Sequence, residues 1–524
     1  MKVALYKPAI RPIYRGSYSL SLACIKAYLQ QHCPDVEVVI CEESDHLLPQ
    51  QPDLIGIAAA ASESWEITKV LVEDLRKQFD GLIILGGQHI TAVPETLPPS
   101  ADLAVLGEGE ETMREIVETL RQRGRAGLKE INGLAYRENG RLVVTPPRPP
   151  LDMDTLPEPA DAPRKFISRN HLYCLSTTRG CPYHCSHCVE WGFHHKVRLM
   201  SAERIFELMM KHYEETGDGN VRFLDDLVTA NLRRILRLRD LMKERGVLGK
   251  FTLGSVSACA HHVTDDMVQA LAEMNACEIG IGMESCSPRV LKLYKGDAVT
   301  LEDIAHAIET CTKYGMPLGG VNLLGYPGET LEEMRETVRF VQEHSKGTTF
   351  KLWGNGYYVC QPLPGSKLWR EGLAAGKLSV EMDFSRLRIA PWDEYDLRIF
   401  DSAWYYGNEE TVSRERFIQF IREQGYQVFD QPDLYASLGP PPLSRLPITT
   451  EQRAAMYERL AQRLEKELTA QTQRNRAGEE QTRQLYQTLA EVKQELKAHA
   501  EALQGLRAIP GVRVASKLSR LFKH

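Results

Sequence analysis

The sequence lacks long apolar runs: no segment approaches about 18 uninterrupted apolar residues, so a membrane-spanning helix is not expected. It also lacks an excess of basic residues, since the formal net charge is −6, and nothing electrostatic favours nucleic acid as a partner. No signal peptide precedes the strand-like segment at 1–6. Its 12 cysteines are mostly scattered, as is typical of reduced thiols. These features predict a cytoplasmic protein.

Residues 1–145 alternate short apolar runs with segments of helical periodicity. Strands are expected at 3–6, 36–41, 54–60, 82–85 and 103–106, and helices near 19–31, 63–79 and 111–123. This alternation predicts a parallel sheet with helices on both faces, which binds ligands beyond the carboxyl ends of its strands.

A proline-rich stretch at 146–166 predicts a semi-rigid linker. From 167 to 375 the alternation resumes, with strands expected at 172–178, 221–224, 251–256, 278–283, 318–324 and 350–357. Residues 376–446 form an extension without an interpretable motif. Residues 447–524 predict a helical, coiled-coil-like tail with a basic amphipathic end, which is either a peripheral membrane or protein contact or a solvated segment.

Three cysteines, Cys181, Cys185 and Cys188, lie in one short loop with the spacing C-x3-C-x2-C. Three thiolates this close can hold three corners of a [4Fe–4S] cube and leave the fourth iron open for chemistry. A zinc knuckle completed by a nearby histidine (His184, His187, His194 or His195) is the alternative, although zinc ligands usually come as two separated pairs. A disulfide is disfavoured because an odd trio in a tight loop pairs badly.

The segment 178–185, Thr-Arg-Gly-Cys-Pro-Tyr-His-Cys, resembles the signature of the radical S-adenosylmethionine (SAM) superfamily. The resemblance continues through 223–226 (Phe-Leu-Asp-Asp), 282–285 (Gly-Met-Glu-Ser) and 324–330 (Leu-Gly-Tyr-Pro-Gly-Glu-Thr). Upstream, 86–89 (Gly-Gly-Gln-His) and 107–110 (Gly-Glu-Gly-Glu) resemble the cobalamin-binding domain of one large branch. One departure is His187, at a position that is usually aromatic.

This resemblance implies an α/β protein with an N-terminal flavodoxin-like (Rossmann-type) cobalamin-binding domain, a radical SAM partial (β/α)6 TIM barrel and a helical C-terminal extension. It implies three cofactors: a [4Fe–4S] cluster on the three cysteines, SAM on the open iron, and cobalamin. The implied function is methylation of an unactivated carbon or phosphorus centre through a 5′-deoxyadenosyl radical and methylcobalamin. The cofactors carry this chemistry, so no catalytic side chain is assigned beyond their ligands.

Residues at strand ends are the further candidates for cofactor binding. For SAM they are Asp225, Asp226, Glu284, Ser285 and Gly325. For cobalamin they are Ser62, Gly86, Gly87, Thr91, Gly107, Glu108 and Gly109. Helix capping by the aspartate pair and a simple turn at Gly325 stay open as structural roles. No Asp-x-His-x-x-Gly string marks a histidine ligand for cobalt, as is usual in the branch that the chain resembles.

Two alternative functions stay open. A radical cyclase or rearrangement enzyme would use the same two domains without methyl transfer. A non-catalytic scaffold or sensor would bind cobalamin or a metal without turnover. For an enzyme, the expected partners are a small-molecule, natural-product or lipid substrate and an external electron donor, with no nucleic acid.

Overall fold

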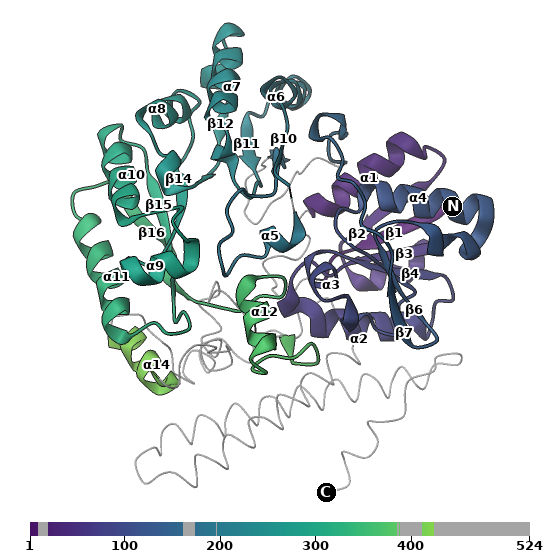
Figure 1. Ribbon diagram of the computed structural model, residues 1–524. Coiled ribbons are helices and arrows are strands. Elements are labelled where there is room, and N and C mark those ends of the chain that lie inside the picture. Colours follow the sequence, from purple (N-terminus) through teal and green to yellow (C-terminus); the bar gives the residue numbers. More distant parts are fainter. Residues whose placement is uncertain (9–18, 161–172, 195, 385–386, 388–410, 424–524) are drawn as a thin grey trace, which may run out of the picture.

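The computed structural model describes residues 1–8, 19–160, 173–194, 196–384, 387 and 411–423. These residues form two α/β units that lie side by side (Figure 1). No helix within these ranges has the length and apolar character that crossing a membrane requires. The predicted tail at 447–524 and most of the predicted extension at 376–446 lie outside the described residues.

The N-terminal unit is built on a seven-stranded sheet with the order β2-β1-β3-β4-β5-β6-β7. Its strands are β1 (Lys2–Tyr6), β2 (Glu37–Cys41), β3 (Leu54–Ala58), β4 (Leu82–Gly86), β5 (Leu103–Val105), β6 (Leu134–Glu138) and β7 (Arg141–Val144). The first five are parallel, and their order is the flavodoxin-like one, as predicted. The central strand β3 is buried along its whole length because helices cover both faces.

Helices cover each face of this sheet with an apolar stripe. Helices α1 (Leu20–His32) and α4 (Glu110–Arg123) pack on one face, and α2 (Trp65–Arg76) and α3 (Gln88–Ala92) pack on the other. In α4 the buried positions Met113, Ile116 and Val117 have the i, i+3, i+4 spacing of one helix face. The predicted helices near 19–31, 63–79 and 111–123 are therefore confirmed.

The hairpin of β6 and β7 is absent from the sequence-based expectations. It pairs antiparallel with β5 and extends the sheet at that edge. Its turn is Asn139-Gly140, with φ of 51° and 79°. Such positive values suit an Asn-Gly pair in a two-residue hairpin, so the dipeptide is itself a sequence signal for this hairpin.

The second unit is an open barrel of parallel strands. They are β8 (Tyr173–Leu175), β11 (Asn220–Phe223), β12 (Thr252–Leu253), β13 (Val256–Ala258), β14 (Ile279–Glu284), β15 (Leu318–Leu324) and β16 (Phe350–Val359). They form two sheets, β12-β11-β8 and β13-β14-β15-β16, which a parallel bridge between Leu253 and Ala276 joins. The six predicted strands are confirmed, with the third one broken into β12 and β13.

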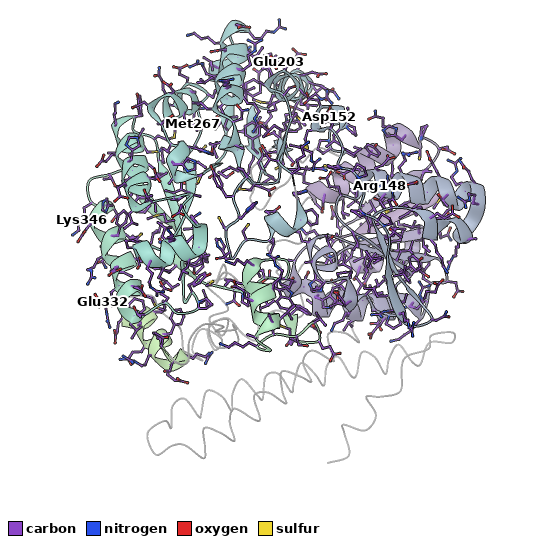
Figure 2. The ribbon with its side chains drawn as sticks, viewed as in Figure 1. Arg148, Asp152, Glu203, Met267, Glu332 and Lys346 are labelled. Carbon is purple, nitrogen blue, oxygen red and sulfur yellow. The ribbon has the colours of Figure 1, made fainter. Side chains whose placement is uncertain are left out.

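Helices line the outside of the barrel as an arc (Figure 1). They are α6 (Ala202–Thr216), α7 (Leu232–Glu244), α8 (Asp265–Glu273), α9 (Pro288–Lys295), α10 (Leu301–Lys313) and α11 (Leu331–His344). Capping boxes begin α10 at Thr300 and α11 at Thr330, each with an acidic residue three positions later. Exposed side chains of these helices, such as Glu203 and Glu332, point away from the strands (Figure 2). Helix α14 (Arg414–Glu423) packs beside α11.

Two segments tie the units together. The described part of the linker contributes Met153 and Leu156 to the core of the barrel. After the barrel, α12 (Lys367–Ala374) and the residues behind it return to the N-terminal unit, where Trp369 and Phe384 join its core. Apolar contacts therefore fasten the linker to the barrel and the segment after the barrel to the N-terminal unit.

Candidate active site

The three cysteines lie in the loop between β9 (Thr178–Arg179) and α5 (Glu190–Phe193). Backbone contacts hold this loop to the barrel. The Gly180 N–H donates to Asp226 Oδ2 at 2.6 Å, and the Ser186 N–H donates to the Tyr294 carbonyl at 2.8 Å. Gly180 has φ of 85°, a conformation that favours glycine. The sequence thus folds the thiols into a restrained loop at the barrel mouth.

The thiols suit a cluster better than a single zinc ion. A tetrahedral zinc with Zn–S bonds of about 2.3 Å would bring its sulfurs within about 4 Å of one another. Among the described residues, the Sγ atoms of the three cysteines do not all lie within 4.8 Å of one another. Burial raises the pKa of each thiol, to about 12 for Cys188, so a bound metal must stabilise the thiolates. This donor set fits an iron–sulfur cube.

Glu284 ends β14 beside the cluster loop. Its carboxylate is buried and forms an ion pair with Lys295 of α9, with Oε1 and Nζ 3.0 Å apart. Burial alone would raise the pKa of Glu284, but Lys295 and His187 lower it below the ordinary value. The φ of Glu284 is 58°, so the backbone is strained at this strand end, as functional sites often are. The buried Nδ1 of His187 has no partner among the described residues, which leaves a polar atom for a ligand such as SAM.

Ser285 and Gly325 make contacts within the protein. The Ser285 hydroxyl lies 3.2 Å from Thr337 Oγ1 of α11. The Gly325 N–H donates to Glu329 Oε2 at 2.6 Å, and the Tyr326 N–H donates to the same oxygen at 3.0 Å. Glu329 therefore closes the turn after β15, and the contacts of both predicted SAM residues are structural ones.

Asp225 and Asp226 diverge, as adjacent residues at a strand end must. Asp225 is engaged with Thr177, whose backbone N–H it accepts at 2.5 Å and whose hydroxyl it also contacts. Burial raises the pKa of Asp225 to about 6. Asp226 accepts from Gly180 and lines the cavity described next. The helix-capping role goes to neither, since Asn231 caps α7 with its own side chain.

A cavity of about 360 Å³ lies between the two units. Its floor is formed by the carboxyl ends of β1, β3, β4 and β5, with apolar side chains such as Leu5, Ile57 and Ile84. Gly86, Gly87, Gly107, Glu108 and Gly109 line it, as predicted from their places after β4 and β5. Gly107 has φ of 76°, a conformation that favours glycine, and a Cβ added there would lie in open space. An apolar floor with a backbone rim fits cobalamin, whose large ring carries amides along its edge.

Ser62 and Thr91 lie outside the lining of this cavity. Ser62 Oγ is 3.0 Å from His89 Nδ1, and Thr91 Oγ1 accepts from the Gly107 N–H at 3.0 Å. Thr91 thus contacts the cavity-lining Gly107, whereas Ser62 contacts His89, which lies outside the lining. His89 stacks on Trp65, and burial lowers its pKa to about 3, so the ring is neutral. Direct contact of Ser62 and Thr91 with cobalamin stays a prediction.

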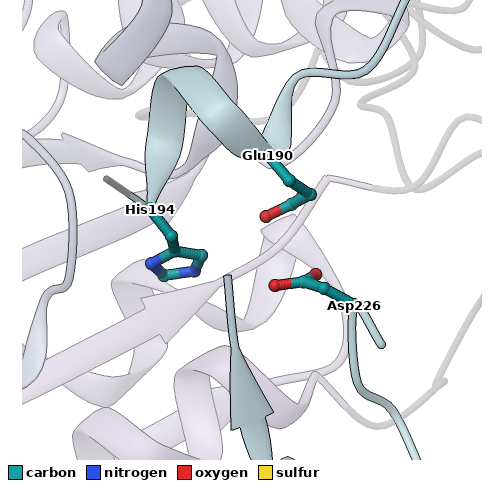
Figure 3. A group of neighbouring side chains, drawn as sticks. All are labelled: Glu190, His194 and Asp226. Carbon is teal, nitrogen blue, oxygen red and sulfur yellow. The ribbon is translucent and has the colours of Figure 1, made fainter. Parts of the chain in front are cut away.

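A polar trio borders the cavity on the barrel side. Glu190, His194 and Asp226 place one ligand atom each within 4.8 Å of one another, and their side chains converge (Figure 3). The Gln88 amide of the N-terminal unit donates to Glu190 Oε1 at 2.7 Å. Burial and the neighbouring Asp226 raise the pKa of Glu190 to about 8. Sequence reasoning missed Glu190 because no local pattern marks it, and it considered His194 only as a ligand of the alternative zinc knuckle.

Comparisons with known proteins agree with this geometry. Residues 175–341 match the Radical SAM superfamily, and residues 8–117 match the B12 binding domain. The chain is 30% identical to the uncharacterized methyltransferase PH0819 of Pyrococcus horikoshii over 62% of this chain and 70% of that protein. This chain belongs to the radical SAM superfamily, in the branch with a B12-binding domain.

Two further similarities extend this result. The cytidylyl-2-hydroxyethylphosphonate methyltransferase of Streptomyces wedmorensis is 24% identical, over 64% of this chain and 69% of that protein. The solved structure of the radical SAM methyltransferase TsrM from Kitasatospora setae, bound to tryptophan and a SAM analog, matches with a TM-score of 0.60 and 19% identity, covering 71% of this chain and 75% of that one. The latter similarity supports the fold.

Membership in this family settles the cofactors. They are a [4Fe–4S] cluster, SAM and cobalamin, and the protein is a radical SAM enzyme. The predicted α/β fold with a flavodoxin-like domain and a partial barrel is confirmed. The roles of the individual site residues stay predictions.

Proposed function

We propose that this chain is a cobalamin-dependent radical SAM methyltransferase that acts on an unactivated carbon or phosphorus centre of a small molecule. The observation that carries the proposal is the shared wall of the two sites. Arg179 lines the cavity and lies two residues before Cys181, so the cluster loop and the corrin-type cavity meet. When bound, the cluster with SAM supplies a hydrogen-abstracting radical, and cobalamin supplies a methyl group.

The residues of the chain bind and orient these groups. Cys181, Cys185 and Cys188 would hold the cluster through their thiolates. Glu284 has the strongest support as a SAM-binding residue. Its carboxylate is buried in an ion pair with Lys295, and the charge of Lys295 also acts on the proposed cluster ligand Cys185. Asp226 lines the cavity, whereas the contacts of Asp225, Ser285 and Gly325 support positioning roles near SAM. For cobalamin, the glycine rim and Glu108 line the cavity, and Ser62 and Thr91 support it.

The partners follow from the same chemistry. Cleavage of SAM at the cluster consumes an electron, so we propose an external electron donor. The phosphonate methyltransferase that the chain resembles is named for a small molecule, which supports a small-molecule substrate here. A cytoplasmic location is proposed because oxygen-sensitive clusters require a reducing compartment.

The test is anaerobic purification with hydroxocobalamin, followed by incubation with SAM and a chemical reductant. Methyl transfer requires both 5′-deoxyadenosine and S-adenosylhomocysteine. Deoxyadenosine alone would favour the cyclase or rearrangement alternative, and neither nucleoside from cluster-loaded protein would favour the scaffold.

A further inference from the structure

A buried ion network joins the two units. Glu108, in the loop after β5, accepts from Arg179 Nη1 at 2.9 Å and from Arg198 Nη1 at 3.2 Å. Glu110 accepts from Arg179 Nη2 at 2.5 Å. The His194 ring lies 3.3 Å from Glu108. All five side chains are 15% exposed or less, so the network is shielded from solvent.

The carboxylates and the guanidinium groups of the network balance one another only while the units stay together. The two carboxylates belong to the N-terminal unit, and the two guanidinium groups belong to the barrel, where the pairing of β9 with β10 (Arg198–Leu199) sets Arg179 and Arg198 side by side. Breaking a buried pair leaves an uncompensated charge, which costs far more than an exposed pair is worth. Burial alone would raise the pKa of Glu108, yet its partners bring it down to about 2. The ion pairs therefore fix one placement of the two units.

Each end of the network also belongs to a cofactor site. Glu108 lines the cavity, and the N–H of the adjacent Gly107 donates to the hydroxyl of Thr91. Arg179 is two residues before the first cluster cysteine, and Arg198 follows the cluster loop. If the cluster orders its loop, it also orders Arg179 and Arg198, whose guanidinium groups hold Glu108 at the cavity rim.

We propose that this ion network couples the two cofactor sites, so that the cluster tightens cobalamin binding and the network carries the effect. The inference rests on the cofactors alone and is independent of methyl transfer. Coupling between two binding sites is a free energy. It is measured by comparing the affinity for one cofactor in the presence and in the absence of the other.

The experiment measures the dissociation constant of hydroxocobalamin by absorbance, anaerobically, for the full chain with its cluster and after the cluster is removed by a chelator. The expected result is binding at least about fivefold tighter with the cluster present. Equal affinities in the two states would overturn the proposal.

Variants then test the network itself. Arg198→Met removes a guanidinium that is absent from the cavity lining, so the affinity ratio should fall to about one while the iron content stays full. Arg198→Lys should restore part of the ratio. The control Arg237→Met removes an exposed ion pair between α7 and Glu203 of α6 and should keep the full ratio.

Glu108→Gln gives an independent check that preserves side-chain shape, and it should also bring the ratio to about one. The proposal is overturned if Arg198→Met or Glu108→Gln binds a full cluster and still shows the wild-type ratio of affinities with and without it. If the cluster tightens cobalamin binding but the protein forms no S-adenosylhomocysteine, methyl transfer is refuted and the coupling of the two sites stands.

Discussion

The cluster loop and the cavity differ in how the chain supplies their residues. All three thiols come from one loop, 181–188, whereas the cavity wall draws on residues from Leu5 to Asp226 and on both units. The loop binds through the chemistry of particular sulfur atoms, and the cavity binds through shape, backbone and small side chains. Substitutions should therefore act in an all-or-none way at the loop and in a graded way at the cavity.

A second contrast concerns buried carboxylates. Glu108 and Glu329 both lose hydration, which raises the pKa of each. At Glu108 the contacts with His194, Arg179 and Arg198 reverse this effect. Glu329 accepts only backbone N–H groups at close range, and its pKa rises to about 8. Charged partners, and not burial, decide which buried acid stays ionised at neutral pH.

The largest expected effect is at the loop. Cys185→Ser removes one of three ligands, so cluster iron and 5′-deoxyadenosine formation should fall more than about 100-fold. The exposed Cys277 is the matched control, and Cys277→Ser should keep both. Iron analysis and chromatography of the nucleosides measure the outcome. A cluster retained in full by Cys185→Ser would contradict the assigned ligand set.

An intermediate effect is expected at the cavity rim. Gly87 has φ of 108°, and an added Cβ would lie 2.7 Å from the Ala59 carbonyl oxygen, so Gly87→Ala must shift the loop. Hydroxocobalamin affinity should fall about tenfold while cluster content is kept. Gly140→Ala also places alanine at a positive φ, but in the open turn of the β6–β7 hairpin, and should leave cobalamin binding unchanged. Equal losses in both variants would mean that general destabilisation is the cause.

The smallest expected effect sharpens the contrast of the carboxylates. The folded-state pKa of Glu329 lies above the ordinary value, so the folded state holds the proton more tightly, and stability falls as pH rises from about 4.5 to about 8. Between pH 6 and pH 9, the free energy of unfolding of the wild type should fall by on the order of 2 kcal/mol more than that of Glu329→Gln. Chemical unfolding at both pH values measures it.

Glu343→Gln on the exposed side of α11 is the control for this test and should keep the wild-type dependence on pH. A Glu329→Gln protein with the same pH dependence as the wild type would show that Glu329 is ionised in the folded state.

Local patterns predicted most of the fold. The parallel strands of both units followed from short apolar runs between helical segments, because a strand buried on both faces must be apolar throughout. The hairpin at Asn139-Gly140 was missed although its dipeptide marked it. Lys295, Arg198 and Glu190 could not be predicted, since each gains its role from residues that are distant in the sequence.

The sequence by itself determined the cofactor chemistry, because the cysteine spacing and the ordered glycine and acidic motifs are contiguous and need no folding to be recognised. Only the tertiary structure decided which of the candidate residues reach the cavity, as Glu108 and Asp226 do, and which lie outside its lining, as Ser62 and Thr91 do. The reason is physical: a side chain's direction and partners depend on the packing of two units, which no local pattern contains.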